Sequence, residues 1–277
     1  MKKRLALLLT VIMAAMLVFA GCGKKEDTAD KKNETTEANA GKDDGKFVVG
    51  FDASFPPYGY KDGDDYVGFD LDLAQEVCDR NGWELVKQPI DWDVKDAELE
   101  AGTIDCIWNG FTINGREEDY TWSEPYVDNS QVIVVMKDSG IKSFADLAGK
   151  VVLVQADSSA LHTLEDKENE KAYALAQTFA DLQQVPEYET ALMNLEAGAA
   201  DAVAMDVGVA KNKLESNDQL MILDEILSTE QYGIGFKKGN TELRDAVQKT
   251  LNEMVEDGTF GKIADKWGLA DSVCLGK

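Results

Sequence analysis

The sequence predicts an α/β fold with two similarly built lobes, and three observations support this. Apolar runs of strand length alternate with helical segments along most of the chain. About 230 residues follow a polar N-terminal region, which is enough for two lobes of ordinary domain size. The pattern Leu-Glu-Ala-Gly occurs at 99–102 and again at 195–198, and each time two residues separate it from an aspartate and an apolar run. Each copy reads as a helix end, a glycine cap and a strand.

Residues 1–21 have the organisation of a lipoprotein signal peptide. A basic start (Met1-Lys2-Lys3-Arg4) precedes an apolar run at 5–19, and Ala20-Gly21 comes directly before Cys22. Such a run is short for a membrane span but typical of a secretory signal. We therefore expect cleavage before Cys22, a lipid such as palmitate on its thiol, and anchoring to the extracytoplasmic face of the cell membrane. Ordinary secretion with an incidental cysteine is the alternative.

Residues 22–46 are expected to be a disordered acidic and polar tether. From Gly23 onward this stretch contains no large apolar side chain, so it cannot bury enough surface to offset the entropy of ordering. The whole chain has a formal net charge of −24. A charge of that size disfavours nucleic acid and anionic lipid headgroups as partners.

The composition gives little support for metal or triad chemistry. Once Cys22 is committed to lipid, Cys78, Cys106 and Cys274 remain, and their spacing matches no metal-binding pattern. The single histidine, His162, weakens any proposal of a zinc site or a catalytic triad. We expect no metal ion, no cofactor and no catalytic residues.

The elements are expected in a regular α/β order. Strands are expected at 47–51, 83–86, 106–108, 131–136, 151–154, 178–179, 202–205 and 231–236. Helices are expected at 71–78, 97–101, 143–149, 162–165, 187–197, 207–214, 243–255 and 259–267. Pro56 and Pro57 prevent the first strand from continuing, so the loop after it should be rigid. Gly82 ends the first helix in the way that helices commonly end.

The stretch NGFTINGREEDYTWSEPY at 109–126 organises the predicted site. It begins where the strand at 106–108 ends, and α/β proteins place ligands at the carboxyl ends of their strands. Arg116 lies there beside backbone amides and the hydroxyl of Thr112. A guanidinium in such surroundings can hold a planar carboxylate by two parallel hydrogen bonds. A surface loop in which Arg116 pairs with Glu117 or Glu118 is the alternative.

Other strand exits carry polar side chains as well. Asp52 follows the first strand, and Asp206 follows the strand at 202–205. Ser158 and Ser159 come after the strand at 151–154, where hydroxyls and amides at a helix N-terminus would suit an anion. Simple capping of that helix by Asp157 or Ser158 is the alternative, and both roles are compatible.

Four segments together resemble the polar-amino-acid family of extracellular solute-binding proteins, which serve ABC importers. They are GFDLDLAQEV (68–77), AGTIDCIWNGFTINGRE (101–117), WSEPYVDNSQ (122–131) and AGAADAVAMD (197–206). The resemblance, which runs from about residue 47 to 267, implies a two-lobed periplasmic-binding-protein-like fold with a ligand cleft between the lobes. Two hinge crossings would fall near 135–137 and 228–231. Lobe 1 would comprise 47–135 with 231–277, and lobe 2 would comprise 136–230.

The resemblance also implies roles for individual residues. Arg116 would clamp the ligand's α-carboxylate, with the backbone of Ser159 meeting the same group. Asp206 would pair with the α-ammonium. The positions around these charged groups would be Asn109, Gly110 and Thr112.

The ligand's side chain would meet a further set of residues. Phe55 and Trp92 would form apolar walls, and Asp52 would lie near the side-chain end. This chain departs from the family pattern in three ways: the run before Arg116 is one residue shorter, Asp157 replaces a frequent glycine, and Trp108 replaces a smaller residue. Charge pairing and cation–π contact would suit a cationic side chain, but a neutral polar or sulfur-containing one would also fit.

The expected function is a monomeric, non-enzymatic receptor. It would bind a free L-amino acid, with a polar or basic one favoured, and deliver it to the transmembrane subunits of an ABC importer. Two alternatives remain open: a periplasmic-type dehydratase on the same fold, and a ligand-sensing receptor for a transmembrane signalling partner.

Overall fold

A computed structural model describes residues 45–277. The expected signal peptide, Cys22 and nearly all of the expected tether lie outside these residues. Among the described helices, none combines the length and the apolar character needed to cross a bilayer.

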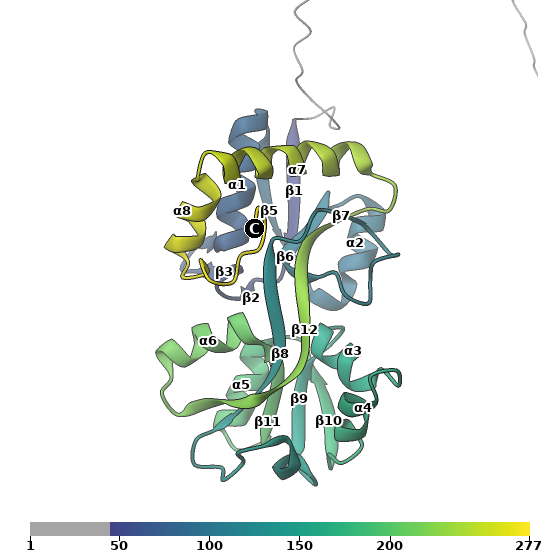
Figure 1. The fold of residues 1–277 in the computed structure, drawn as a ribbon, viewed down its shortest axis with the longest axis vertical. Coiled ribbons are helices and arrows are strands. Elements are labelled where there is room, and N and C mark those ends of the chain that lie inside the picture. Colours follow the sequence, from purple (N-terminus) through teal and green to yellow (C-terminus); the bar gives the residue numbers. More distant parts are fainter. Residues whose placement is uncertain (1–44) are drawn as a thin grey trace, which may run out of the picture. The chain divides into compact units, whose positions relative to one another are not determined.

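The first lobe is formed by two parts of the chain and includes the C-terminus (Figure 1). Its central strands are parallel, with β1 between β5 and β6. The strands are β1 (Lys46–Phe51), β5 (Glu84–Pro89), β6 (Cys106–Thr112) and β7 (Thr121–Trp122), with a small antiparallel sheet of β2 (Ser54–Phe55), β3 (Gly59–Asp62) and β4 (Asp65–Val67). The helices are α1 (Phe69–Asn81), η1 (Trp92–Val94), α2 (Lys95–Ala101), α7 (Thr241–Glu256) and α8 (Thr259–Lys266).

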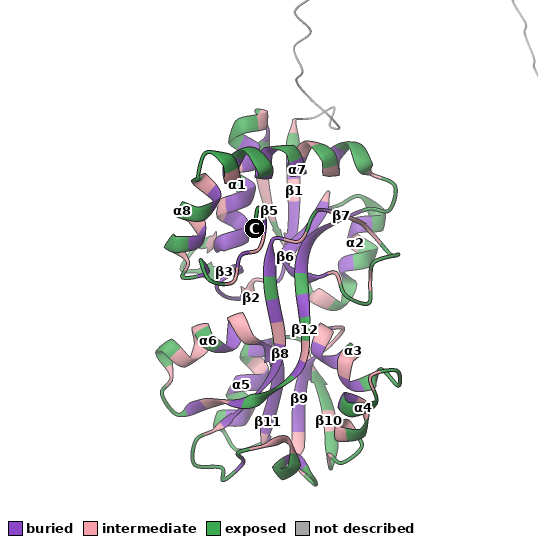
Figure 2. Ribbon diagram, in the orientation of Figure 1, coloured by how far each residue is buried: buried purple, intermediate pink, exposed green. Residues whose placement is uncertain are grey.

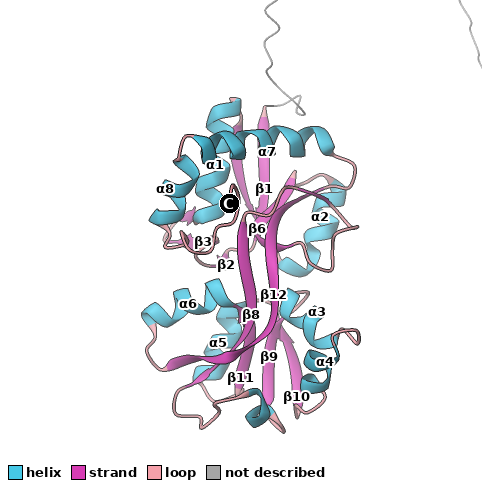
Figure 3. Cartoon of the chain, viewed as in Figure 1, coloured by secondary structure: helices cyan, strands magenta, loops and turns pink. Residues whose placement is uncertain are grey.

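The second lobe repeats this plan on a smaller scale, with helices beside its strands (Figure 3). Its strands are β9 (Val151–Gln155), β10 (Asp181–Val185) and β11 (Ala202–Asp206). Both outer strands pair with β9 in parallel. Its helices are η2 (Phe144–Leu147), α3 (Ser159–Glu165), α4 (Glu170–Ala176), α5 (Tyr188–Glu196) and α6 (Val207–Ser216).

Two long antiparallel strands, β8 (Val127–Met136) and β12 (Leu220–Phe236), run through both lobes. They join the sheets in the order β10-β9-β11-β8-β12-β6-β1-β5. The prediction of a first crossing near 135–137 is wrong, because residues 131–135 of β8 already pair with β11. The crossing therefore lies at 127–130, where β8 pairs with residues 229–232 of β12. The lobe boundary predicted at 135/136 therefore also moves to this crossing at 127–130.

Three further elements differ from the sequence expectations. The prediction of a strand at 178–179 is wrong, because Thr178 ends a helical turn by donating to Leu175 O. The strand instead follows as β10. Helix α4 was not predicted, since it buries only Ala172 and so lacks an apolar stripe. Strand β12 begins eleven residues earlier than expected, because charged side chains interrupt its apolar pattern.

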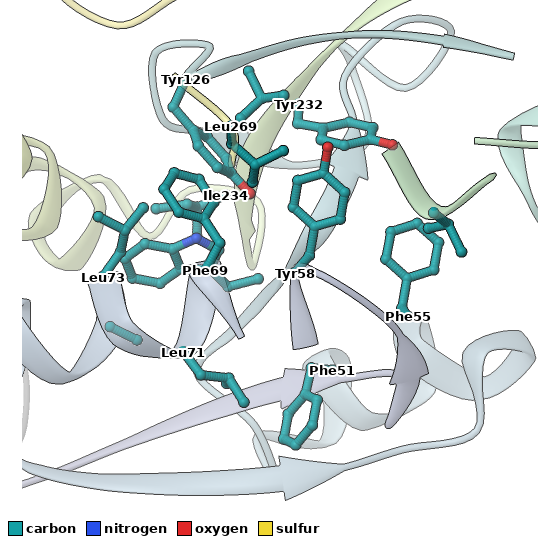
Figure 4. Packing of buried hydrophobic residues seen from close by; sticks show 14 of the residues in the cluster. Phe51, Phe55, Tyr58, Phe69, Leu71, Leu73, Tyr126, Tyr232, Ile234 and Leu269 are labelled. Carbon is teal, nitrogen blue, oxygen red and sulfur yellow. The ribbon is translucent and has the colours of Figure 1, made fainter. Parts of the chain in front are cut away.

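Buried residues concentrate along the strands of each lobe (Figure 2). An aromatic cluster packs beside the cleft in the first lobe: Tyr58 lies 5.2 Å from Tyr232 and 5.7 Å from Phe55 between ring centroids, and Figure 4 shows the three side chains together. The backbone of Tyr58 is held by α1, since Asp70 N donates to Tyr58 O. Gly68 lies just before α1, and a Cβ there would be 2.1 Å from Tyr58 O.

Gly68→Ala should therefore lower the free energy of unfolding strongly. Its φ of 148° is accessible almost only to glycine, and the added carbon would meet a backbone atom that cannot turn aside. We expect a loss of at least about 3 kcal/mol in urea unfolding. Gly63→Ala is the matched control, because Gly63 also has a positive φ but a Cβ added there would have no atom within 4 Å. This control should lose only about 1–2 kcal/mol. Equal losses would contradict this explanation.

Candidate functional site

The two lobes contact each other across a cleft lined by strand ends. Asp52, which follows β1, accepts a hydrogen bond of 2.7 Å from Gln155 Nε2 at the end of β9. Ser54 Oγ donates to Glu187 Oε2 of the second lobe at 3.1 Å. The cleft includes a cavity of about 800 Å³ lined by residues of both lobes, Arg116 among them. The strand exits chosen from the sequence are thus brought together.

Asp206 is almost completely buried at the exit of β11, with 4% of its surface exposed. Its Oδ2 accepts from the hydroxyl of Tyr188 at 2.9 Å, and its Oδ1 accepts from the hydroxyl of Tyr232 at 2.5 Å. Oδ1 also accepts from Asn129 Nδ2 at 2.8 Å and Gln131 Nε2 at 2.7 Å. Burial, and then the charge of Glu230, raise the pKa of Asp206 to about 7. Its position would suit a cationic group of a ligand.

Glu230, on β12, is a second buried carboxylate that the sequence analysis did not select. Its exposed fraction is 5%, and its Oε1 accepts from the same Asn129 and Gln131 nitrogens at 2.7 and 2.8 Å. Thr112 Oγ1 donates to Oε1 at 2.8 Å, and Ser159 Oγ donates to Oε2. The hydroxyls of two predicted site residues therefore face Glu230. The motif WSEPYVDNSQ contains both amide residues, so it held a signal for this cluster.

Arg116 lies next to this cluster and reaches across the cleft. Its Nη1 donates to Thr112 O at 3.3 Å, and its Nη2 donates to Asp157 O in the second lobe at 3.2 Å. The guanidinium carbon lies 5.3 Å from the centre of the Phe111 ring. Within residues 45–277, Arg116 forms no ion pair with Glu117 or Glu118, so the surface-loop alternative has no support. The guanidinium has further N–H groups available for an anion.

Asp157 is held by side chains from both lobes, the ammonium of Lys95 and the imidazole of His162. Its φ is 54°, the left-handed region that glycine adopts easily, which is consistent with the glycine expected there from the family pattern. Its carboxylate pairs with Lys95, which is 1% exposed, and with His162 Nε2 at 3.0 Å. Burial alone would raise the pKa of Asp157, but the bonds from His162 and Lys95 outweigh it and hold the pKa below its usual range. The extra negative charge expected near the carboxylate site is thus compensated.

Of the residues expected around the ligand's side chain, two lie at contacts between the lobes and the third packs within the first lobe. Asp52 is buried, and burial raises its pKa to about 6 although the hydrogen bond from Gln155 opposes this. Phe55 lies 5.9 Å from Tyr188 of the second lobe, measured between ring centroids. Trp92 instead packs against Phe111, at 5.4 Å between ring centroids, beneath the ammonium of Lys95. The wall role of Trp92 stays a prediction.

Asn109 and Gly110 hold the cleft's backbone in place. Asn109 Oδ1 accepts from Asp52 N at 2.8 Å, and Gly110 N donates to Asp70 Oδ2 at 2.6 Å. The amide of Gly110 is therefore already occupied within the first lobe. Asp70 also accepts from the hydroxyl of Tyr126 at 2.9 Å. Asp70, part of the GFDLD segment, is a positioning residue that the sequence analysis used only for the resemblance.

Asp70→Asn should reduce the fall of stability with rising pH. Burial raises the pKa of Asp70 to about 7, so between the unfolded value near 3.8 and 7 the folded state binds more protons than the unfolded state. The stabilising contribution is complete below the unfolded pKa and is lost as pH rises through about 7. The folded pKa lies about two units above pH 5, so the free energy of unfolding should fall by about 2–3 kcal/mol between pH 5 and pH 8.

Urea unfolding of both proteins at pH 5 and pH 8 measures this difference. Asp79→Asn, a change at an exposed position of the same helix, is the control and should keep the wild-type pH dependence. If Asp70→Asn keeps it as well, Asp70 does not carry the proton.

Two α/β lobes that enclose a polar cleft and are joined by paired strands define a hinged ligand-binding protein. This chain belongs to the bacterial extracellular solute-binding proteins, family 3, because the model of that family matches residues 47–270. The family resemblance and the two-lobed fold predicted from the sequence are confirmed.

Named relatives cover nearly the whole chain. The arginine-binding extracellular protein ArtP of Bacillus subtilis (strain 168) is 30% identical over 267 residues, which are 94% of this chain and 96% of ArtP. The L-cystine-binding protein TcyA of the same organism is 30% identical over 272 residues, 96% of this chain and 97% of TcyA. A crystal structure of an ABC uptake transporter substrate-binding protein from Streptococcus pneumoniae with bound histidine is 34% identical, with a TM-score of 0.76, covering 81% of this chain and 92% of that one.

Proposed function

We propose that this protein is a receptor that binds a free L-amino acid between its lobes and delivers it to an ABC importer. The observation that carries the proposal is the placement of a guanidinium and two carboxylates close together where the two lobes meet. Thr112 O accepts from the guanidinium of Arg116, and Thr112 Oγ1 donates to Glu230, which shares two amide donors with Asp206. The α-carboxylate of an amino acid could therefore meet the guanidinium, while its α-ammonium meets the carboxylates.

The side chain of the ligand is expected to be polar or basic. The named relatives bind arginine, cystine and histidine, so their ligands share the amino-acid main chain while the side chains differ. Asp52 supplies a buried carboxylate for a cationic or hydrogen-bonding end. The protein is proposed to act as a monomer.

A dehydratase and a signalling receptor are the competing functions. The raised pKa of Asp206 would also suit a general base, which is the one observation that favours an enzyme. Family membership and the names of the relatives favour binding without chemical conversion and delivery to a transporter.

Arg116→Ala should weaken amino-acid binding about a hundredfold to a few thousandfold. The closed cleft would bury the pair of guanidinium and α-carboxylate, and breaking such a pair commonly costs about 3–5 kcal/mol, at about 1.4 kcal/mol per tenfold. Arg116→Lys should restore only part of the affinity, because an ammonium lacks the planar two-donor fork. Calorimetric titration against a panel of L-amino acids measures the change.

Arg80→Ala is the matched control. Arg80, on α1, pairs with Glu76 and Asp257 and with none of the predicted site residues, so the Arg80→Ala change should leave affinity unchanged. Wild-type affinity in Arg116→Ala would remove Arg116 from the site.

We also propose that lipid on Cys22 anchors the protein to the extracytoplasmic face of the cell membrane. The basic start, the apolar run and Ala20-Gly21 before Cys22 support this, and residues 23–46 would act as the tether. Cys22→Ala should abolish labelling by a radioactive fatty acid and release the protein from the membrane, with unchanged ligand affinity. Cys274→Ala, at the other end of the chain, should keep the label. Labelled Cys22→Ala protein would show that the anchor is elsewhere.

A further inference from the structure

Asp206 and Glu230 form a pair of buried carboxylates in the cleft. We propose that Glu230 is a second acidic residue of the ligand site: the two carboxylates together receive the amino acid's α-ammonium, and its arrival expels a proton that they share in the empty cleft. This inference rests on the proposed function and adds to it one residue and one proton.

Two shared amides draw the carboxylates together. Asn129 Nδ2 and Gln131 Nε2 each donate to both Asp206 Oδ1 and Glu230 Oε1, at 2.7 or 2.8 Å in every case. This orientation leaves Asn129 Oδ1 and Gln131 Oε1 buried without hydrogen-bond partners. Reversing either amide would point its oxygen at two carboxylate oxygens. The charges of the pair therefore fix the orientation of both amides, even though two acceptors stay unsatisfied.

No cation of the described chain compensates the pair. The other donors to the two carboxylates are all neutral hydroxyls: Tyr188 and Tyr232 for Asp206, and Thr112 and Ser159 for Glu230. Neutral hydrogen bonds stabilise a buried carboxylate, but they do not cancel its charge. Two carboxylates that share one site do not both ionise easily, so such a pair retains a proton to higher pH than a single carboxylate.

The other titratable groups around the pair do not change this conclusion. Burial and the neighbouring carboxylates raise the pKa of Tyr58, Tyr188 and Tyr232 well above the usual value, so all three stay neutral at physiological pH. Arg116 donates to two backbone carbonyl oxygens, and Lys95 pairs with Asp157. A positive charge for the pair must therefore come from the ligand.

An α-ammonium fits this requirement. It carries one positive charge and three N–H donors, which can be divided between two carboxylates. In the empty cleft near neutral pH, the pair holds one proton and one negative charge. When the ammonium binds, both carboxylates are ionised, the bound cluster has the same net charge, and the proton leaves to the buffer. The raised pKa of Asp206 is consistent with a proton held in this range.

Proton release is measured by calorimetry in two buffers of different ionisation enthalpy. The probe is whichever amino acid binds most tightly in a panel of L-amino acids that includes L-arginine and L-cystine. At pH 6.5, wild-type protein should release at least about half a proton per bound amino acid, and affinity should rise by up to about tenfold per pH unit from 5.5 to 7.5. Glu230→Gln should release close to none and should bind at least about tenfold more weakly at pH 7.5.

Two further variants separate this mechanism from its competitors. Glu225→Gln makes the same chemical change on the same strand, at an exposed position, and should behave as the wild type. Asp52 is a cleft carboxyl outside the pair whose pKa is also raised, so Asp52→Asn shows whether the proton comes from the side-chain end instead.

The outcomes separate failure of this inference from failure of the proposed function. Wild-type protein that binds an amino acid without proton release overturns the inference alone, whether or not Glu230→Gln folds. The inference is also overturned if Asp52→Asn abolishes proton release on binding while Glu230→Gln retains it. Wild-type protein that binds no amino acid in the panel overturns the proposed function, and the inference with it.

Discussion

The cleft depends on carboxylates that are buried among neutral donors. Asp206 and Glu230 are each about 5% exposed or less, and hydroxyl and amide groups surround them. Removing such charges from water is costly unless an opposite charge replaces the solvent. A ligand that brings an ammonium group supplies that charge at the point where the two lobes meet. The same constraint explains why an uncharged ligand of similar shape would be a poor substitute.

The groups that hold this pair lie on the strands that connect the lobes. Asn129 and Gln131 belong to β8, while Glu230 and Tyr232 belong to β12. Any rotation of one lobe against the other must pass through these two strands, because they are the segments that cross between the sheets. If the proposed site is right, the ligand's charge and the arrangement of the lobes are linked through these residues, as expected of a protein that closes around its ligand.

Local sequence patterns predicted the residues at strand exits, and they failed where burial depends on distant partners. Asp52 and Asp206 follow apolar runs, so their positions at the cleft could be read from the sequence. Glu230 lies in a strand interrupted by charges, and its burial results from pairing with β8 and contact with Ser159 of the second lobe. The ion pair of Lys95 with Asp157 likewise joins residues of opposite lobes. Contacts of this kind exist only once both lobes are assembled.

We propose that the cleft holds an unmodified amino acid by its main-chain charges. Native mass spectrometry of gently purified protein, followed by release and identification of the retained molecule, tests it directly. We expect a free L-amino acid with an intact α-ammonium and α-carboxylate, recovered unchanged after incubation. A retained sugar, a dicarboxylic acid without an amino group, or a dehydrated product of the added amino acid would contradict it.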